Sequence, residues 1–387
     1  LELLQLTTEA KQLKKLIKAL RKILDHETEC DRIVAEELAG IRDRHGDDRR
    51  TTIEDEVRRL DVDVAVMVKD VEVVVGVTRE GWIKRSSMAS FLATGGTRKT
   101  SGVRPGDRML VLVDTRTTHN VLVFSDKGMC YPIPVHQIPE AKWGEVGSAL
   151  VNVCGMSREE RLVDVIAPQS TADDADHLMF VTEQGKVKAT ETAEFESTRS
   201  AGILAAKLSD GDALSRVIPT NLKGDTILLS HFGQGIRFEA HEISVQGRSA
   251  KGVTGMKVGK GDRIQDVQLI MPHEDLKVAV FTRAGRAKLT PLDQFPKQRR
   301  GGKGVRMIIS RVSNRHECVA ISVTDGHDGF EVVDTLGHEH LIDAKRIPVT
   351  RRDGNAWTIV ELKNGALVSI VEQLPAVKEA PAKVDAS

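Results

Sequence analysis

Features that would identify a secreted, membrane-spanning or zinc-binding protein are scarce in this sequence. Its four cysteines, Cys30, Cys130, Cys154 and Cys318, are isolated, and no Cys/His group has the spacing of a zinc site. Isolated thiols are typical of a reducing cytosol. No run of about 18 apolar residues could span a membrane, and residues 1–6 do not resemble a signal peptide. We therefore expect a cytoplasmic protein, and the missing initiator Met indicates a fragment of a longer chain.

Net charge and catalytic motifs are also missing. The 387 residues carry 56 basic and 56 acidic side chains, so only local clusters of charge could indicate a nucleic-acid partner. No P-loop, G-x-S-x-G, H-E-x-x-H or strand-associated G-x-G-x-x-G occurs. His338-Glu339-His340 is too closely spaced for the helical zinc motif, and the only tyrosine, Tyr131, is expected at a partly buried strand position. The sequence thus predicts no catalytic residue, metal site or cofactor of its own.

Residues 1 to about 45 are predicted to be helical. Apolar residues recur there on two interleaved seven-residue grids, which are Leu6, Leu13, Leu20, Val34 and Ile41, and Ala10, Ile17, Leu24 and Leu38. Such a stripe is typical of a helix that packs on another helix, in a coiled-coil arm or on a globular neighbour. The grid fails at Glu27 and Asp31, which predicts a short or interrupted seam. Gly46 is expected to end the helix.

From about residue 62 to residue 371 the pattern changes to short β-forming runs separated by glycine-bearing turns. A β-run, a polar turn and a second run with basic residues recur six times, with turn glycines Gly81, Gly128, Gly185, Gly235, Gly285 and Gly337. A second glycine follows 17–21 residues later, at Gly102, Gly147, Gly202, Gly252, Gly304 and Gly354. Six such units predict a mainly β, six-bladed propeller-like domain, which two stacked sandwiches would not explain.

The predicted organisation therefore has three parts. Residues 1–60 form the end of a helical arm and a charged connector, and residues 61–374 form the six-repeat β-domain. Residues 375–387 are polar, contain two prolines, and are expected to be a disordered tail.

The densest cluster of positive charge lies in the fifth repeat. It consists of Lys297, Gln298, Arg299, Arg300, Gly301, Gly302, Lys303 and Gly304, with four cations and no carboxylate. Glycines let a backbone approach a phosphate chain and present its N–H groups. Arginine forks match phosphate oxygens. The segment predicts a phosphate-backbone contact, with a merely solvated basic loop as the alternative.

Cations recur at related positions of the other repeats. In the loops they are Arg98, Lys99, Arg104, Lys142, Arg199, Arg248, Lys251, Arg351 and Arg352, and in the hairpins Lys84, Arg85, Lys186, Lys188, Arg237, Arg286 and Lys288. Equivalent positions of a propeller lie on one circle, so these cations would form a positive belt even in a neutral chain. Such a belt predicts a surface on which duplex DNA bends without base contacts.

The seven residues 298–304, Gln-Arg-Arg-Gly-Gly-Lys-Gly, are identical to the signature box of the C-terminal domain of gyrase A subunits. Residues 46–51, Gly-Asp-Asp-Arg-Arg-Thr, resemble the end of the coiled-coil arm that leads into that domain. Over nearly its whole length except the tail, the chain thus resembles the C-terminal region of bacterial type II topoisomerase A subunits. Residues 81–87 and 134–139, with Lys142, Trp143 and Gly147, are more similar to topoisomerase IV. In gyrase, however, the box belongs to the first blade, whereas here it lies in the fifth.

The resemblance implies a six-bladed β-pinwheel that binds and bends or wraps double-stranded DNA. It implies a chromosome-associated A2B2 enzyme in the bacterial cytoplasm, with ATP and Mg²⁺ in the partner B subunit. This region would present a transfer segment for decatenation and relaxation or, in a gyrase, wrap DNA for negative supercoiling. It would not cleave DNA, because the family's catalytic tyrosine follows an arginine upstream, whereas Tyr131 follows Cys130. The competing interpretations are a protein-binding propeller scaffold and a propeller enzyme with a site in its central channel.

Overall fold

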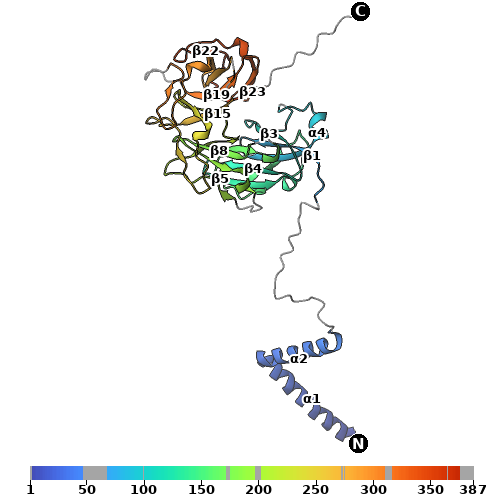
Figure 1. Cartoon of the computed structure of the whole chain (residues 1–387). Helices are drawn as coiled ribbons and strands as arrows, with labels where there is room; N and C mark the ends of the chain where they lie inside the picture. The colour runs from blue at the N-terminus through green and yellow to red at the C-terminus, as the bar shows by residue number, and fades with distance from the viewer. Residues whose placement is uncertain are drawn as a thin grey trace, which may run out of the picture. The chain divides into compact units, whose positions relative to one another are not determined.

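The computed structural model describes residues 2–46, 68–98, 100–170, 175–196, 202–271, 273, 275–309, 316–363 and 365–374. The chain divides into two compact units, residues 1–62 and 63–387, and each is considered by itself (Figure 1). The predicted connector after Gly46, the predicted tail at 375–387, Lys99 and Arg199 lie outside the described residues.

The N-terminal unit is helical as predicted, and it contains two helices. Helix α1 spans Glu2–Asp25 and helix α2 spans Glu27–His45. The break is at His26, whose backbone is extended, directly before the position where the apolar grid fails. Without an apolar side chain at Glu27 or Asp31, no continuous apolar seam favours an uninterrupted helix across this point. Gly46 ends α2 as predicted, and its N–H donates to the Arg42 carbonyl at 2.6 Å.

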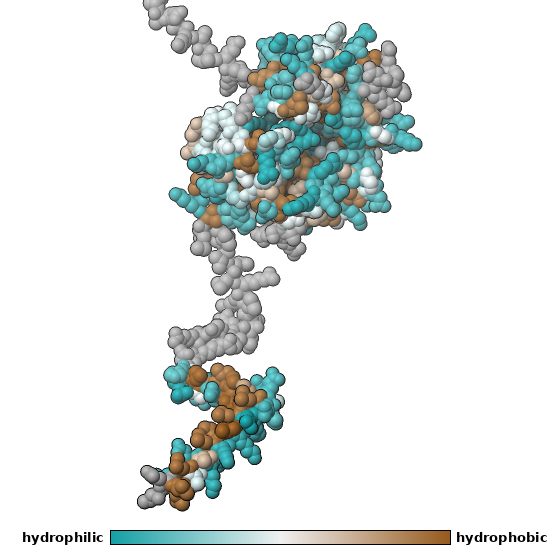
Figure 2. All heavy atoms as spheres, turned by 180° about the vertical axis from the view of Figure 1, so that it is seen from behind, coloured by the Kyte–Doolittle hydropathy of each residue, from teal (hydrophilic) through white to brown (hydrophobic). Residues whose placement is uncertain are grey.

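Most apolar side chains of the predicted grid are exposed on these two helices. Leu6, Leu13 and Leu20 each leave half or more of their surface accessible. Figure 2 shows hydrophobic side chains running along both helices. The N-terminal unit thus presents a long apolar face, as a coiled-coil arm does. No described helix is long and apolar enough to cross a membrane.

The second unit consists of six antiparallel sheets, and the predicted six-bladed, mainly β fold is confirmed. Each repeat supplies a hairpin and a third strand on its inner side. In blades 1 to 3 these strands are β1 (Glu72–Thr78), β2 (Trp82–Ser87) and β3 (Met109–Arg116), then β4 (Asn120–Ser125), β5 (Met129–Pro134) and β7 (Leu162–Ile166), then β8 (His177–Thr182), β9 (Lys186–Glu191) and β11 (Leu214–Thr220).

Blades 4 to 6 repeat this arrangement. Their strands are β12 (Asp225–Ser230), β13 (Gln234–Glu239) and β15 (Ile264–Ile270), then β16 (Lys277–Thr282), β17 (Arg286–Pro291) and β19 (Cys318–Thr324), then β20 (Gly329–Asp334), β21 (Glu339–Asp343) and β23 (Val368–Leu374). Short helices follow several strands, namely α4 (Met88–Ala93), α5 (Leu150–Val153), η1 (Val135–Gln137), η2 (Pro168–Ser170), η3 (Thr192–Phe195), η4 (Ala240–Glu242), η5 (Leu292–Gln294) and η6 (Ala344–Arg346).

The fourth strand of a blade comes from the following repeat. Blades 1 to 5 are completed in this way by two-residue strands, which are β6 (Ser148–Ala149), β10 (Ile203–Leu204), β14 (Val253–Thr254), β18 (Val305–Arg306) and β22 (Trp357–Thr358). Each pairs antiparallel with the second hairpin strand of the preceding repeat. Within the described residues blade 6 has three strands, in the order β21-β20-β23, and the outer edge of β21 has no paired strand.

The hairpin turns require glycine because their backbone has positive φ. This holds for Gly81, Gly128, Gly185, Gly285 and Gly337. In the fourth repeat the turn residue with positive φ is Gly233, so the assignment of this turn to Gly235 was wrong. Gly235 lies instead in β13, against the exchanged strand β18.

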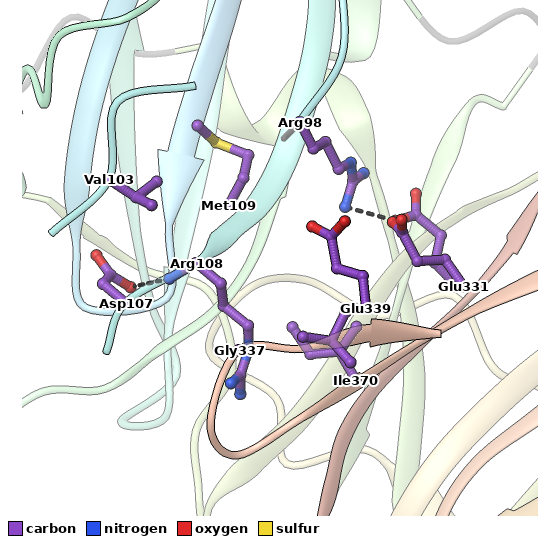
Figure 3. A pocket seen from close by; sticks show the side chains of 11 residues that line it. Arg98, Val103, Asp107, Arg108, Met109, Glu331, Gly337, Glu339 and Ile370 are labelled. Carbon is purple, nitrogen blue, oxygen red and sulfur yellow. Dashed lines mark hydrogen bonds and ion pairs between the residues drawn. The ribbon is translucent and has the colours of Figure 1, made fainter. Parts of the chain in front are cut away.

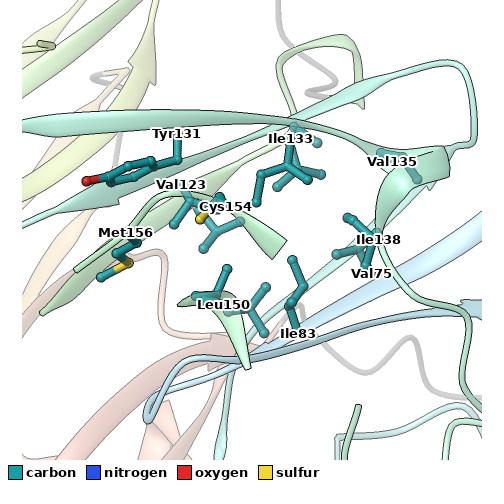
Figure 4. Close-up of a cluster of buried hydrophobic side chains, with 14 of the residues drawn as sticks. Val75, Ile83, Val123, Tyr131, Ile133, Val135, Ile138, Leu150, Cys154 and Met156 are labelled. Atoms are coloured by element: carbon teal, nitrogen blue, oxygen red, sulfur yellow. The ribbon is translucent and has the colours of Figure 1, made fainter. Parts of the chain in front are cut away.

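Apolar cores lie between successive blades. Figure 4 shows the core between blades 1 and 2, where Val75 and Ile83 face Val123 and Tyr131. Similar cores join blades 2 to 6. Because both faces of a central blade are covered, successive residues of one strand can both be buried, as Val187 and Lys188 of β9 are.

Blades 6 and 1 meet across a different kind of boundary. A cavity of about 450 Å³ lies there, lined from blade 1 by Arg98, Arg108 and Met109 and from blade 6 mainly by Glu331, Glu339 and Glu372 (Figure 3). Arg98 and Glu372 form an ion pair across it at 2.5 Å. We call this boundary the seam; it combines these charged side chains with the apolar Val103, Met109, Val333 and Ile370.

Candidate nucleic-acid interface

The segment before each exchanged strand has the same geometry in four repeats. It begins where one residue forms a parallel bridge with the preceding blade, at Glu140, Val245, Lys297 and Val349. We call residues 140–149, 245–254, 297–306 and 349–358 exchange loops 2, 4, 5 and 6. Each runs ten residues from its bridge to the end of its exchanged strand, so residues at one offset are structurally equivalent.

This equivalence corrects two of the second glycines chosen from the sequence. In loops 2, 4 and 5 the exchanged strand directly follows Gly147, Gly252 and Gly304, but in loop 6 it follows Ala356, so Gly354 was wrong. A Gly-Asp pair, Gly211-Asp212 in repeat 3 and Gly261-Asp262 in repeat 4, comes nine residues after the second glycine. Counting back from the matching Gly106-Asp107 of repeat 1 gives Thr97, not Gly102.

Three of the predicted DNA-binding lysines are buried. The exposed fractions of Lys84, Lys188 and Lys288 are 1%, 2% and 0%. Lys188 Nζ donates to the carbonyls of Ala205, Gly247 and Arg248 at 2.7–3.0 Å. Lys84 and Lys288 donate in the same way to carbonyls of exchange loops 2 and 6. These ammonium groups hold the loops to the preceding blade and are inaccessible to DNA in this structure, because burial on both faces of a blade leaves them no route to solvent.

Arg237 of blade 4 lies one residue beyond the position of these lysines, at the bridge position that Arg85 and Ala189 occupy in blades 1 and 3. Its guanidinium donates to Asp225 Oδ2 at 2.6 and 2.8 Å and to the carbonyls of Leu292 and Phe295. Asp225 also pairs with Lys297 Nζ at 2.9 Å, and this contact raises the pKa of Lys297. Arg237 therefore acts inside the protein, and the positive charge of Lys297 is partly neutralised.

The exposed cations of the exchange loops form a smaller set than the sequence suggested. They are Lys142, Lys251, Lys297, Arg299, Lys303, Arg306 and Arg351. Arg306 was missed from the sequence because it lies just outside the box. It could have been found by extending the loop to the exchanged strand. Among the other predicted residues, Arg286 is exposed, Arg85 and Lys186 are half-buried, and Arg98 lies at the seam.

Three arginines at equivalent positions are half-buried and bonded to the protein. The backbone N–H of Arg248, Arg300 and Arg352 donates to Glu194, Glu242 and Gln294 respectively, at 3.0–3.3 Å. The guanidinium of Arg300 also donates to the Thr254 carbonyl, and that of Arg352 to the Arg306 carbonyl. Arg300 and Arg352 are thus directed towards neighbouring loops, whereas Arg248 pairs with Glu194 of η3 at 3.6 Å.

The glycines of the box are used for packing. Gly304 has a φ of +70°, and a Cβ there would overlap the carbonyl oxygen of Gly235. Gly301 has a φ of +82° and its N–H donates to the Gly255 carbonyl at 2.6 Å. The box can therefore lie flat on blade 4, with Gln298 half-buried and Gly302 close to Ile236.

Positive charge is unevenly distributed among the exchange loops. Up to the residue before the exchanged strand, loop 4 has two cations, loop 5 has four, and loop 6 has two with one carboxylate, Asp353. Loop 2 has one cation, Lys142, and two carboxylates, Glu140 and Glu145. The basic surface therefore extends over loops 4 to 6 on three consecutive blades, and it does not include loop 2.

The structure gives no support to a site built on the other chemical groups considered. Tyr131 is buried, and its hydroxyl donates to Glu160 at 2.8 Å. Burial raises the pKa of this hydroxyl, and of the Cys130 and Cys318 thiols. No group of three His, Cys, Asp or Glu side chains within the described residues could hold a metal ion.

Comparison with known proteins matches the β-domain to one family. The model of the family described as DNA gyrase C-terminal domain, beta-propeller, matches residues 119–168, 176–221, 225–271 and 277–325. The chain is 31% identical over 370 residues to the A subunit of DNA topoisomerase 4 from Bacillus subtilis (strain 168), covering 95% of this chain and 45% of that protein. It is 32% identical over 298 residues to the A subunit of DNA gyrase from Salmonella typhimurium, covering 76% and 33%. The chain thus spans less than half the length of these relatives.

Solved structures agree with this match. The crystal structure of the C-terminal domain of DNA topoisomerase IV superposes with a TM-score of 0.70 at 28% identity, covering 79% of this chain and 94% of that one. The structure of the DNA gyrase A C-terminal domain has a TM-score of 0.60 at 18% identity, covering 78% and 99%, and supports the fold alone.

Proposed function

Because this chain belongs to the family of C-terminal β-propellers of bacterial type II topoisomerase A subunits, we propose that its β-domain binds and bends double-stranded DNA. The bound duplex follows exchange loops 4 to 6. The observation that carries the proposal is the recurrence of exposed cations on three consecutive loops of one geometry, namely Lys251, Arg299, Lys303, Arg306 and Arg351.

Phosphate contacts from such a surface are independent of base sequence. Cations on successive blades meet successive parts of a duplex backbone, and the released counterions favour binding. Bending the duplex around three blades costs several kcal/mol, on the order of 1–6 for 40–90°, which these contacts offset. Six exposed cations in loops 4 to 6, namely Lys251, Lys297, Arg299, Lys303, Arg306 and Arg351, are enough for such a contact surface, even though the chain has no net charge.

Within a whole enzyme, this domain would present the transfer segment to the DNA gate. We propose an A2B2 type II topoisomerase in the bacterial cytoplasm, with ATP and Mg²⁺ held by the B subunit. We propose decatenation and relaxation, with negative supercoiling as the alternative, because a topoisomerase IV A subunit is 31% identical over 95% of the chain and a gyrase A subunit is 28% identical over 96%. The buried, hydrogen-bonded Tyr131 takes no part in DNA cleavage in this proposal.

Duplex binding by the Arg299→Ala/Lys303→Ala double variant tests the proposal. We expect weaker binding to duplexes of any sequence, and a plot of log affinity against log salt that is shallower by about 2, one per lost contact. The control is Lys223→Ala, which removes an exposed cation outside the exchange loops. Equal binding by the double variant and the parent, measured by fluorescence anisotropy, would remove the basis of the proposal.

The alternative function is a protein-binding scaffold, and the same anisotropy measurement distinguishes it from DNA binding. A scaffold needs no salt-dependent duplex binding. A parent chain that binds no duplex DNA at low salt would therefore point to that class.

A further inference from the structure

Consecutive exchange loops are joined by hydrogen bonds that repeat from one loop to the next. Arg300 Nη1 donates to the Thr254 carbonyl at 3.2 Å, and Arg352 Nη1 donates to the Arg306 carbonyl at 2.8 Å. Each acceptor is the second residue of the exchanged strand of the preceding loop. Loop 6 is thus joined to loop 5, and loop 5 to loop 4.

The same arginines are held from the other side by short helices. Arg300 Nε donates to the backbone carbonyl of Glu242, the last residue of η4. The backbone N–H of Arg300 donates to the carboxylate of the same glutamate. The N–H of Arg352 donates to Gln294, the last residue of η5. The Arg300 guanidinium donates to the carbonyls of Glu242 and Thr254 and is thus held between η4 and exchange loop 4. The neighbouring Arg299 is exposed.

We propose that Arg300 and Arg352 are positioning residues that set the spacing of successive exchange loops, and thereby the curvature imposed on bound DNA. The exposed Arg299, Lys303 and Arg351 make the phosphate contacts. The inference rests on the proposed function, because it assigns roles within that surface. Displacing one loop relative to the next changes the arc that the cations describe, but leaves their number unchanged.

Substitution of each arginine by lysine separates the two roles. Arg300→Lys keeps the positive charge, but one ammonium group cannot reproduce the forked geometry that joins Glu242 to Thr254. We expect the affinity for a straight duplex of about 20 base pairs to change by less than about twofold, since few phosphates contact it. The linking-number change that the chain imposes on a relaxed plasmid with a nicking-closing enzyme should fall at least about twofold, because this quantity depends on bending. Arg352→Lys should act in the same way at the next joint.

Two matched controls distinguish positioning from loss of folding. Arg158→Lys alters an exposed arginine outside the exchange loops with its charge kept, and should change neither measurement. Glu242→Gln keeps a side-chain oxygen that can accept from the backbone N–H of Arg300, as Gln294 accepts from Arg352 in the next repeat, and should preserve the linking-number change. Glu242→Ala removes this acceptor and should reduce the linking-number change. Thermal unfolding of each variant verifies that the β-domain is intact.

The inference is overturned if Arg300→Lys weakens short-duplex binding as strongly as Arg299→Ala, because Arg300 would then contact DNA itself. It is also overturned if the lysine variants leave the linking-number change at the parental value. If the parent chain binds no duplex, the proposed function is contradicted. If the parent wraps DNA and the Arg300→Lys and Arg352→Lys variants wrap it equally, only this inference is contradicted.

Discussion

At the scale of single residues, cations of one chemical type have opposite roles in this domain. Lys188 and Lys251 both belong to the basic pattern of the repeats, but Lys188 is 2% exposed and bonded to three carbonyls, whereas Lys251 is exposed. A buried ammonium group replaces its water with carbonyl oxygens and links the segments that carry them. Buried lysines therefore hold the exchange loops in place, and exposed cations on those loops form the basic surface.

Removing one buried ammonium should therefore destabilise the β-domain. For Lys188→Met we expect the free energy of unfolding to fall by about 1–3 kcal/mol, since buried carbonyls lose their donor. Denaturation in urea measures the change. Lys223→Met, at an exposed position, should stay within about 0.5 kcal/mol of the parent, and an equal loss for both would refute the assigned role of Lys188.

The buried lysines also predict a pH dependence of stability. Burial lowers the pKa of Lys84, Lys188 and Lys288 to about 8, from 10.5. Between these values the unfolded chain binds more protons than the folded protein, so the free energy of unfolding rises with pH. Above pH 9 the buried Cys130 and Cys318 thiols, whose pKa burial raises, act in the opposite direction.

Stability is therefore expected to rise between about pH 8 and 9. Urea denaturation across this interval measures the slope, and Lys188→Met should reduce it while Lys223→Met should not. A parent whose stability falls steadily over the same interval would contradict a lowered lysine pKa.

At the scale of elements, the exchange loop depends on the close approach of its last glycine to the preceding blade. Gly304→Ala combines a positive φ with an overlap between the new Cβ and the Gly235 carbonyl oxygen, so β18 could pair with β13 only after a backbone shift. We expect a loss of about 1–3 kcal/mol or more in unfolding free energy, together with weaker duplex binding. Gly259→Ala is the control, because a Cβ there has no neighbour within 4 Å and no positive φ. A Gly304→Ala variant as stable as this control would refute the packing argument.

The elements also show why the fold was easier to predict than the site. Hairpin turns need glycine, so their recurrence revealed six blades. The exchanged strands have two residues each, too few for a β-pattern, so nothing in the sequence indicates that β18 completes the blade before its own. In repeat 1, helix α4 precedes the loop, and no exchanged strand follows Gly102 among the described residues. Lys84 was assigned to DNA because it recurs among the hairpin cations, but its side chain is buried because packed blades cover both faces of the sheet.

At the scale of the whole β-domain, the seam places several charged side chains around a cavity between blades 6 and 1. Glu331 and Glu372 pair directly across β20 and β23, a like-charge arrangement that the Arg98–Glu372 ion pair offsets. Burial, opposed by Arg98, raises the pKa of Glu372. The blade on this side also has an outer strand, β21, without a paired neighbour among the described residues.

Blade 6 should therefore open more often than blades 3 and 4. We expect the amide hydrogens of β21 to exchange at least about tenfold faster than those of β9 and β13, whose outer edges are paired by β14 and β18. Hydrogen exchange followed by mass spectrometry measures this difference. Equal protection of β21 and β13 would show that the seam is as stable as the other boundaries.

Completing each blade with residues from the next repeat also orders events during synthesis. As the ribosome extends the chain, β12 and β13 emerge well before β18, so blade 4 stays unfinished until about 65 further residues have been made. A nascent chain halted after any repeat would expose one unpaired edge strand, and such edges promote aggregation. Vectorial folding of blades 1 to 5 should consequently advance one repeat behind translation.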